Sequence, residues 1–298
     1  MKHTEQIPRI PVGTLIKGDK EPGRQIRDLA SFGFETFSIM FWQHTGDTDL
    51  TRMAEETSQA SRRTGTPLSS LSIYGNTLDD SETGQRTRED LTRLIRLAPS
   101  MGVSLVSCFA GRVPGTSVPE SIPRWYEVFA PLAELAEAHG VSIAFENCRM
   151  GDTWKKGSWN IAINPDAWEL MFSRLESPHL GLEWEPCHQV EALIDPLPQL
   201  SAWLPRIIHI HGKDSRINHE LIRSKGLYGK HRWHASCFPG RGDTDWQSLF
   251  RILLDSGYQG TVDIEGWNDR DYDEQRELTG QREALRYLLE VRSKALGR

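Results

Sequence analysis

The hydrophobic positions of this chain repeat one pattern eight times. Each repeat has a short apolar run rich in β-branched and aromatic residues, then a polar loop, then a longer stretch with the spacing of an amphipathic helix. Apolar runs of this length predict buried strands. The predicted strands are residues 10–16, 34–42, 67–75, 103–111, 141–146, 179–185, 206–211 and 261–265.

A predicted helix follows each of these strands. The helical stretches are residues 21–33, 49–65, 86–102, 119–140, 164–176, 195–205, 243–257 and a long final one within 273–296. Alternating elements imply a parallel sheet, and eight of them without a change of composition favour a closed (β/α)8 barrel over an open sheet. No GxGxxG segment follows the first strand, which argues against a dinucleotide-binding fold. We predict an α/β protein with one barrel domain over residues 1–298.

Composition and charge narrow the possible classes of function. The 38% hydrophobic and 26% charged residues are ordinary for a globular protein. A net charge of −6 without a dense basic stripe argues against a nucleic-acid partner, and no apolar run is long enough for a membrane span. The four cysteines are widely spaced, and residues 1–10 lack the apolar core of a signal peptide. We expect a cytoplasmic protein with reduced thiols.

Four predicted strands of the second half each end in a side chain that can bind a metal: Glu146, Glu185, His211 and Glu265. A buried strand does not end in a charged side chain unless a partner of opposite charge, such as a metal ion, neutralises that charge. In a barrel the carboxyl ends of the strands meet at one face, where active sites form. Three carboxylates and one imidazole suit Mn²⁺, Mg²⁺ or Co²⁺, and Zn²⁺ is also possible. We predict one divalent cation, with Mn²⁺ as the first choice.

Five segments resemble a known family in their order along the chain: IAFEN, GLEWEPCH, HIHGKD, PGRGDTDW and GYQGTVDIEGW. The chain resembles the xylose isomerase-like barrels known as sugar phosphate isomerases and epimerases over nearly its whole length. The segment from Glu146 to Trp168 resembles the IolE-like branch, which contains inosose dehydratases. Two departures stand out: Glu185 stands where the family usually has Asp, and no Arg or Lys cluster suggests a phosphate clamp.

The resemblance implies roles for individual residues. Glu146, Glu185, His211 and Glu265 would bind the metal, and His188 would contact the substrate. Glu146 and Glu265 would carry protons on opposite faces of a sugar. Removal of the proton beside a carbonyl gives an enediolate, and the return of the proton decides between epimerisation and isomerisation.

Further candidates for substrate contacts lie in the loops after the strands. Aromatic faces stack on sugar C–H surfaces, and Lys, Arg and His donate to hydroxyls. For each such residue the alternative is an exposed or packed loop side chain. The loops 147–163, 186–194, 212–242 and 266–272 include two long ones, which are typical of lids and binding loops. The candidates are Trp42, His44, Arg112, Lys213 and His234.

Three other functions stay open at this point. The same enediolate would expel a leaving group from the next carbon, giving a 3-keto-glycoside lyase, a deglycosidase or an inosose-type dehydratase. Apurinic endonucleases share the barrel, but their three-zinc site needs His at the third and fourth strand ends, which read SIYGN and CFAGR here. The third is a non-enzymatic role, either as a catalytically silent subunit of a heteromeric deglycosidase or as a sugar-binding protein. We expect a sugar or keto-sugar substrate, a homodimer or homotetramer, and no membrane partner; a small β partner would fit a heteromeric deglycosidase.

Overall fold

Eight parallel strands form a closed barrel in the order β1-β10-β7-β6-β5-β4-β3-β2. The computed structural model describes residues 10–267, 269–272 and 276–297. Each predicted strand overlaps one barrel strand, so the predicted (β/α)8 barrel is confirmed. The strands are β1 Val12–Lys17, β2 Phe37–Trp42, β3 Leu68–Tyr74, β4 Leu105–Cys108, β5 Ser142–Glu146, β6 Leu180–Trp184, β7 Ile207–Gly212 and β10 Val262–Ile264.

The helices follow the strands as the amphipathic pattern predicts. Gly65 ends α2 with φ 72°, the left-handed conformation expected of a C-terminal glycine. The helices are α1 Pro22–Leu29, α2 Leu50–Thr64, α3 Glu82–Leu97, α4 Val118–Ala138, α5 Pro165–Arg174, α6 Pro186–Glu191, α7 Pro196–Trp203, α8 His219–Lys225, α9 Trp246–Asp255 and α10 Glu277–Ala295. Residues 273–275, where the last predicted helix begins, lie outside the described residues.

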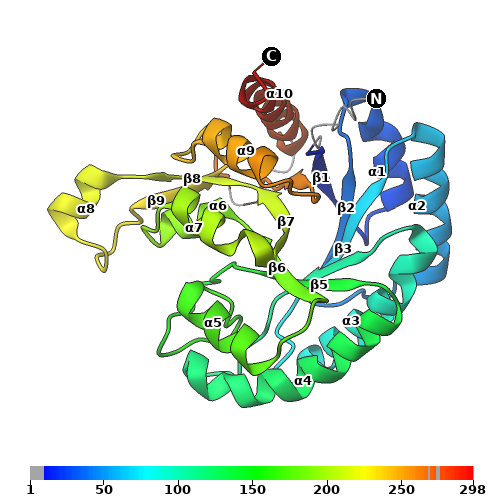
Figure 1. Cartoon of the computed structure of the whole chain (residues 1–298), viewed down its shortest axis with the longest axis horizontal. Coiled ribbons are helices and arrows are strands. Elements are labelled where there is room, and N and C mark those ends of the chain that lie inside the picture. Colours follow the sequence, from blue (N-terminus) through cyan, green and yellow to red (C-terminus); the bar gives the residue numbers. More distant parts are fainter. Residues whose placement is uncertain (1–9, 268, 273–275, 298) are drawn as a thin grey trace, which may run out of the picture. The chain divides into compact units, whose positions relative to one another are not determined.

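The chain divides into two compact units, and residues 15–184 form one of them. In this unit β2 to β6 pair in parallel, and α3 and α4 lie along the outside of β3 to β5 (Figure 1). Trp125, Phe129 and Phe145 are buried between α4 and β5, with the Phe129 and Phe145 ring centroids 4.9 Å apart. This packing fixes β5, and with it the position of Glu146 at the end of the strand.

The other unit contains residues 10–14 and everything described from Glu185 onward. Here β10 pairs with β1 on one side and with β7 on the other, with Asp263 opposite His211. The register places Glu265 beside the end of β7, and its backbone N–H donates to the Gly212 carbonyl at 3.1 Å. The ends of β7 and β10 are therefore held together by the backbone.

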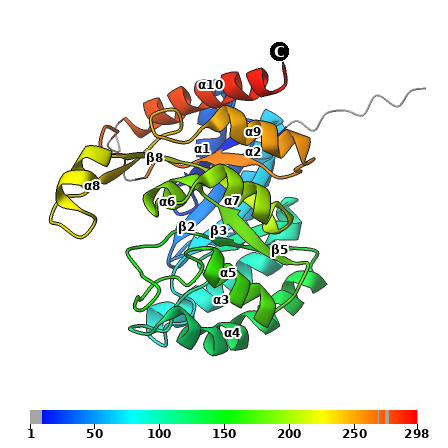
Figure 2. The same ribbon diagram turned by 60° about the vertical axis from the view of Figure 1, so that its left-hand side comes forward.

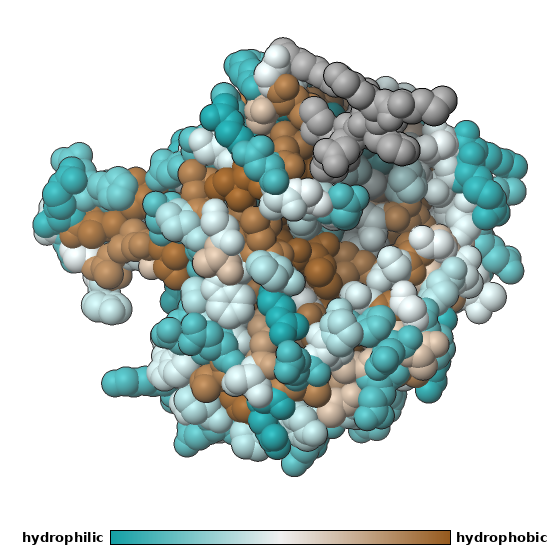
Figure 3. Space-filling view, viewed as in Figure 1, coloured by the Kyte–Doolittle hydropathy of each residue, from teal (hydrophilic) through white to brown (hydrophobic). Residues whose placement is uncertain are grey.

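Part of the predicted loop 212–242 is ordered secondary structure, so its assignment as a loop was wrong. Strands β8 (Asp214–Ile217) and β9 (His234–Cys237) pair antiparallel, and α8 lies between them. We call residues 214–237 the arm; it extends away from the rest of its unit (Figures 1 and 2). Apolar side chains are visible on its surface, and Tyr228 is fully exposed (Figure 3). Because the arm has little buried face, its sequence lacks the alternation that reveals strands.

Cys108, Cys148, Cys187 and Cys237 are free cysteines. Among the described residues, none of the helices has the length and apolar character needed to cross a bilayer.

Candidate metal centre

Three of the four predicted ligands meet at the carboxyl ends of β7 and β10. The His211 Nδ1 atom lies 3.0 Å from a Glu265 carboxylate oxygen and 3.5 Å from a Glu185 carboxylate oxygen. Glu185 directly follows β6 and begins α6 as its N-cap residue. All three side chains are buried. Two carboxylates and an imidazole thus share a small volume away from water.

Lys213 neutralises part of this charge. Its Nζ donates to Glu265 Oε1 at 2.5 Å and lies 3.6 Å from Glu185 Oε1. Burial alone would raise the pKa of Glu265, but the Lys213 ammonium and the His211 imidazole hold it well below its ordinary value. These two contacts stabilise the charged form of the Glu265 carboxylate.

The donor set fits a divalent cation. The two buried carboxylates, Glu185 and Glu265, both lie close to the His211 imidazole and the Lys213 ammonium, and buried charge is costly without such partners. Glu185, His211 and Glu265 belong to a group of buried residues whose ligand atoms lie within 4.8 Å of one another. Oxygen donors with one imidazole are typical of Mg²⁺, Mn²⁺ or Co²⁺ sites, and Zn²⁺ accepts the same donors.

Glu146, the fourth predicted ligand, lies in the other unit as the last residue of β5. Its side chain is buried, and its backbone carbonyl accepts a hydrogen bond from the Asn160 side chain at 2.8 Å. β5 pairs with β6 in parallel, with Glu146 opposite Glu183. Its part in metal binding stays a prediction.

His188 and His234 are linked by Glu191, a residue that the sequence analysis missed. His188 lies on α6, with its Nε2 atom 3.2 Å from Glu185 Oε1 and its Nδ1 atom 3.6 Å from Glu191 Oε2. The Nδ1 atom of His234 lies 2.9 Å from Glu191 Oε1. A signal was present in the sequence, because Glu191 follows His188 by three residues and such pairs share one face of a helix.

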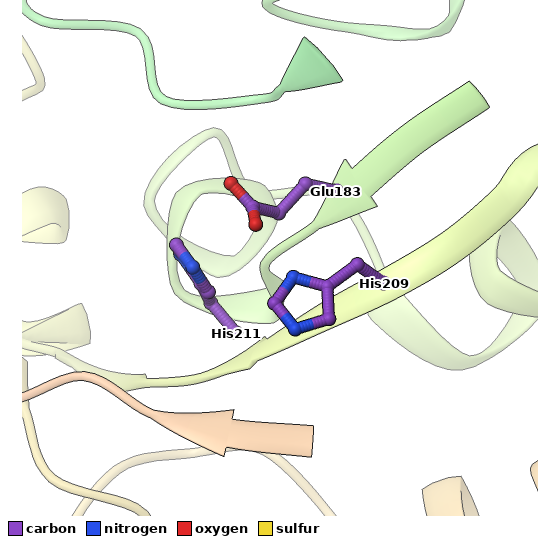
Figure 4. Close-up of side chains that lie close together, drawn as sticks. All are labelled: Glu183, His209 and His211. Atoms are coloured by element: carbon purple, nitrogen blue, oxygen red, sulfur yellow. The ribbon is translucent and has the colours of Figure 1, made fainter. Parts of the chain in front are cut away.

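A buried polar pair beside the cluster was also missed. His209 and His211 lie two residues apart on β7, so that both rings leave the same face of the strand (Figure 4). The His209 Nε2 atom lies 2.8 Å from Asp263 Oδ2, which also accepts a hydrogen bond from the Thr261 hydroxyl at 3.1 Å. The sequence analysis noted only His211 in the run 206–211. Nothing in that run indicates that His209 pairs with Asp263.

The other predicted substrate residues in the unit of residues 15–184 differ in exposure. Trp42 is 46% exposed, and its ring lies 5.8 Å from that of Trp159 and 6.4 Å from that of Phe109. Tyr74 continues this aromatic group, 5.2 Å from Phe109. His44 is half-buried, and its Nδ1 atom accepts a hydrogen bond from the Gly46 N–H at 3.1 Å. Trp42 thus presents an apolar face at the end of β2, and His44 belongs to the turn that follows.

Arg112 is fully buried and holds two loops together. Its guanidinium donates to the carbonyls of Thr116, Thr153 and Trp154 at 2.6–3.2 Å and lies 3.7 Å from Asp152. Asp152 in turn accepts from three backbone N–H groups of residues 158–160. These contacts give Arg112 a structural role in the loop that follows β5.

The change Arg112→Met is expected to lower the free energy of unfolding by about 3–5 kcal/mol, because it leaves Asp152 buried without its charged partner. Arg124→Met is a matched control, since Arg124 is partly exposed in its ion pair with Asp80 and should cost no more than about 1 kcal/mol. Denaturant unfolding of both variants measures the difference. Equal, small losses in the two variants would contradict the structural role.

Two relatives resemble the chain in sequence. The protein YfiH of Bacillus subtilis (strain 168) is 28% identical over 247 residues, which cover 71% of this chain and 74% of YfiH. Inosose dehydratase of Lactiplantibacillus plantarum is 27% identical over 151 residues, which cover 49% of this chain and 47% of that enzyme. The second likeness therefore spans about half of each protein.

Solved structures share the fold over almost the whole chain. The 3-keto-D-glucoside 4-epimerase YcjR from E. coli, in its apo form, is 18% identical with a TM-score of 0.69, covering 95% of this chain and 100% of that one. A barrel protein from Mycobacterium smegmatis in complex with magnesium is 20% identical with a TM-score of 0.70, covering 97% and 98%. The model of one family matches residues 26–291. Together with the closed barrel, this match shows that the chain belongs to the xylose isomerase-like TIM barrel family.

Proposed function

We propose that the protein is a divalent-metal-dependent isomerase or epimerase that moves a proton on a sugar or keto-sugar. The observation that carries this proposal is the buried contact of Glu265 with both His211 and Lys213, beside Glu185. Glu265, as proton acceptor and ligand, shares the site with two further candidate ligands, Glu185 and His211, an arrangement suited to metal-assisted chemistry next to a carbonyl. The structural likeness to a 3-keto-D-glucoside 4-epimerase and the sequence likeness to an inosose dehydratase support a carbohydrate substrate.

Glu265 is the proposed proton acceptor on one face of the sugar. Lys213 fixes its orientation through Oε1. Removal of the proton from the carbon beside the carbonyl leaves an enediolate. Glu146 is the proposed proton carrier on the opposite face, so that return of the proton there inverts the carbon. Return to the neighbouring carbon gives isomerisation.

Glu146, Glu185, His211 and Glu265 are the proposed ligands of the metal. Their strands β5, β6, β7 and β10 are consecutive in the closed barrel order, and each ligand stands at or just after the end of its strand. When bound, the ion would supply Lewis-acid stabilisation of negative charge on the sugar oxygens. Mn²⁺ is our first choice, and the magnesium complex of the mycobacterial family member supports an ion of this class.

Substrate contacts are proposed for His188 and for the exposed face of Trp42. Aromatic rings stack on the C–H faces of sugars, and Trp42 offers such a face next to Trp159. His188 is almost buried and lies directly beside Glu185. Lys213 and His234 are further proposed substrate contacts, and they lie beside the Glu265 and Glu191 carboxylates.

A second candidate function is elimination from the same intermediate. A lyase, deglycosidase or inosose-type dehydratase would use Glu265 in the same way, and the likeness to an inosose dehydratase favours this alternative. The two candidates differ only in the fate of the enediolate. A leaving group on the next carbon directs it to elimination.

Incubation with ketoses and 3-keto-glucosides in D₂O with Mn²⁺, followed by NMR, tests the proposal. We expect deuterium at the carbon beside the carbonyl, and we expect exchange to stop after chelation and to resume when Mn²⁺ is restored. Epimerised or isomerised sugar supports the first candidate, and a released aglycone or a dehydrated sugar supports the second. Exchange that is equally fast in chelated protein would contradict the metal requirement, and the lack of exchange with every sugar would contradict the function.

A further inference from the structure

Glu191 is a buried carboxylate at the end of α6 that none of the roles above explains. It is 9% exposed and belongs to the same short helix as His188. Carboxylates are almost never buried unless they are paired or hydrogen-bonded. The partners of Glu191 therefore indicate what it does.

Three elements meet at this one side chain. The hydroxyls of Ser215 and Ser236 donate to Glu191 Oε1 at 3.2 and 2.9 Å. These two serines are opposite each other in the β8–β9 pair, at the base of the arm. His234 on β9 reaches the same oxygen, while His188 on α6 faces the other oxygen. Glu191 thus joins the base of the arm to the helix that carries His188.

The electrostatics of the contact keep Glu191 charged. Burial alone would raise the pKa of Glu191, but His188 and His234 lower it well below its ordinary value. A carboxylate beside one ring nitrogen of a histidine restricts the orientation of the ring. For His188, Glu191 lies beside Nδ1 and Glu185 lies beside Nε2, so the ring is held between two carboxylates.

We propose that Glu191 is a positioning residue that orients His188 for substrate binding and couples that orientation to the arm. The inference rests on the function proposed above, because His188 is the proposed substrate contact. The rival explanation is that Glu191 only ties the arm to α6. In that case the loss of Glu191 would lower the stability of the protein. Its effect on activity would then be the same with and without His188.

A double-mutant cycle separates these two explanations. Glu191→Gln keeps the size of the side chain and removes its charge. We expect kcat/KM for deuterium exchange to fall by about 10- to 100-fold, the usual effect of losing such an orienting partner. In the His188→Asn background the same change should add less than about 2-fold, because its effect passes through His188. Equal losses in both backgrounds would overturn the proposal.

Two further variants keep the cycle interpretable. Glu191→Asp retains the charge but withdraws it by one methylene, so we expect an intermediate loss. Glu220→Gln on α8 is the control for the substitution, because Glu220 is an exposed carboxylate of the arm and should leave kcat/KM unchanged. A loss with Glu191→Asp that exceeds the loss with Glu191→Gln would contradict the role of the charge.

An NMR readout is independent of turnover. The ¹⁵N shifts of the His188 ring in metal-free protein, assigned by comparison with His188→Asn, report the surroundings of its two nitrogens. We expect Glu191→Gln to change them, with the fold retained in thermal unfolding, and unchanged shifts would overturn the inference. If wild-type protein exchanges no sugar proton, the proposed function fails, while the NMR result still decides whether Glu191 orients His188.

Discussion

Replacing Glu265 with Gln is expected to reduce turnover by about 10²- to 10⁴-fold, the usual contribution of a positioned general base. Gln keeps the shape of the side chain but cannot accept a proton. It also loses the ion pair that Lys213 makes with Glu265 Oε1. Glu146→Gln is expected to have an effect of the same order, because it is the proposed carrier on the other face. Steady-state rates of deuterium exchange and of product formation measure both.

The two variants also distinguish the faces of the sugar. If each carboxylate serves one face, Glu265→Gln and Glu146→Gln should block exchange from opposite epimers. Glu290→Gln on α10 is the matched control, since Glu290 makes an exposed ion pair with Lys294 and should leave the rate unchanged. Wild-type rates in either active-site variant would remove that residue from the mechanism.

His211→Ala is expected to weaken metal binding by more than about 100-fold, because it removes a ligand. Loss of a residue that only orients a ligand costs roughly 10- to 100-fold. The His211 Nδ1 atom contacts both Glu185 and Glu265, so its loss also leaves these carboxylates less well compensated. Calorimetric titration with Mn²⁺ and metal analysis after dialysis measure the effect.

His209→Asn is the matched control for this variant. His209 lies two residues earlier on the same face of β7, and its Nε2 atom is 2.8 Å from Asp263. The change should lower the thermal unfolding midpoint while Mn²⁺ affinity stays near that of the wild type. An equal loss of Mn²⁺ in the two variants, with both folded, would show that the ligand assignment at β7 is wrong.

The barrel itself was predictable from local pattern. A buried parallel strand reads as a continuous apolar run, so β5, β6, β7 and β10 were all visible in the sequence. The arm was not visible in this way, because strands with little buried face carry no such signal. Helix α6 was missed for another reason: it has only six residues, too few to show a helical period.

The candidate site was predictable in its residue types but not in its pairings. Strand ends indicated Glu185, His211 and Glu265, and the structure brings these three together. Arg112 lies in a loop after a strand, where ligand-binding residues are common. Its guanidinium N–H groups nevertheless donate to backbone carbonyls. Exposure and hydrogen-bond partners decide between such roles, and neither is a property of local sequence.

The sequence by itself determined the eightfold alternation and the residue types at the strand ends. Burial of apolar side chains makes each strand a short apolar run, and the polar residue that ends the run can be read directly. Only the tertiary structure decided that Lys213 holds Glu265 and that Glu191 joins His188 to Ser215 and Ser236 on the arm. Lys213 and Glu265 are 52 residues apart, and their meeting depends on the register of β7 against β10. Register depends on which faces of both strands are buried against their partners, so it is settled between segments that are far apart in the sequence.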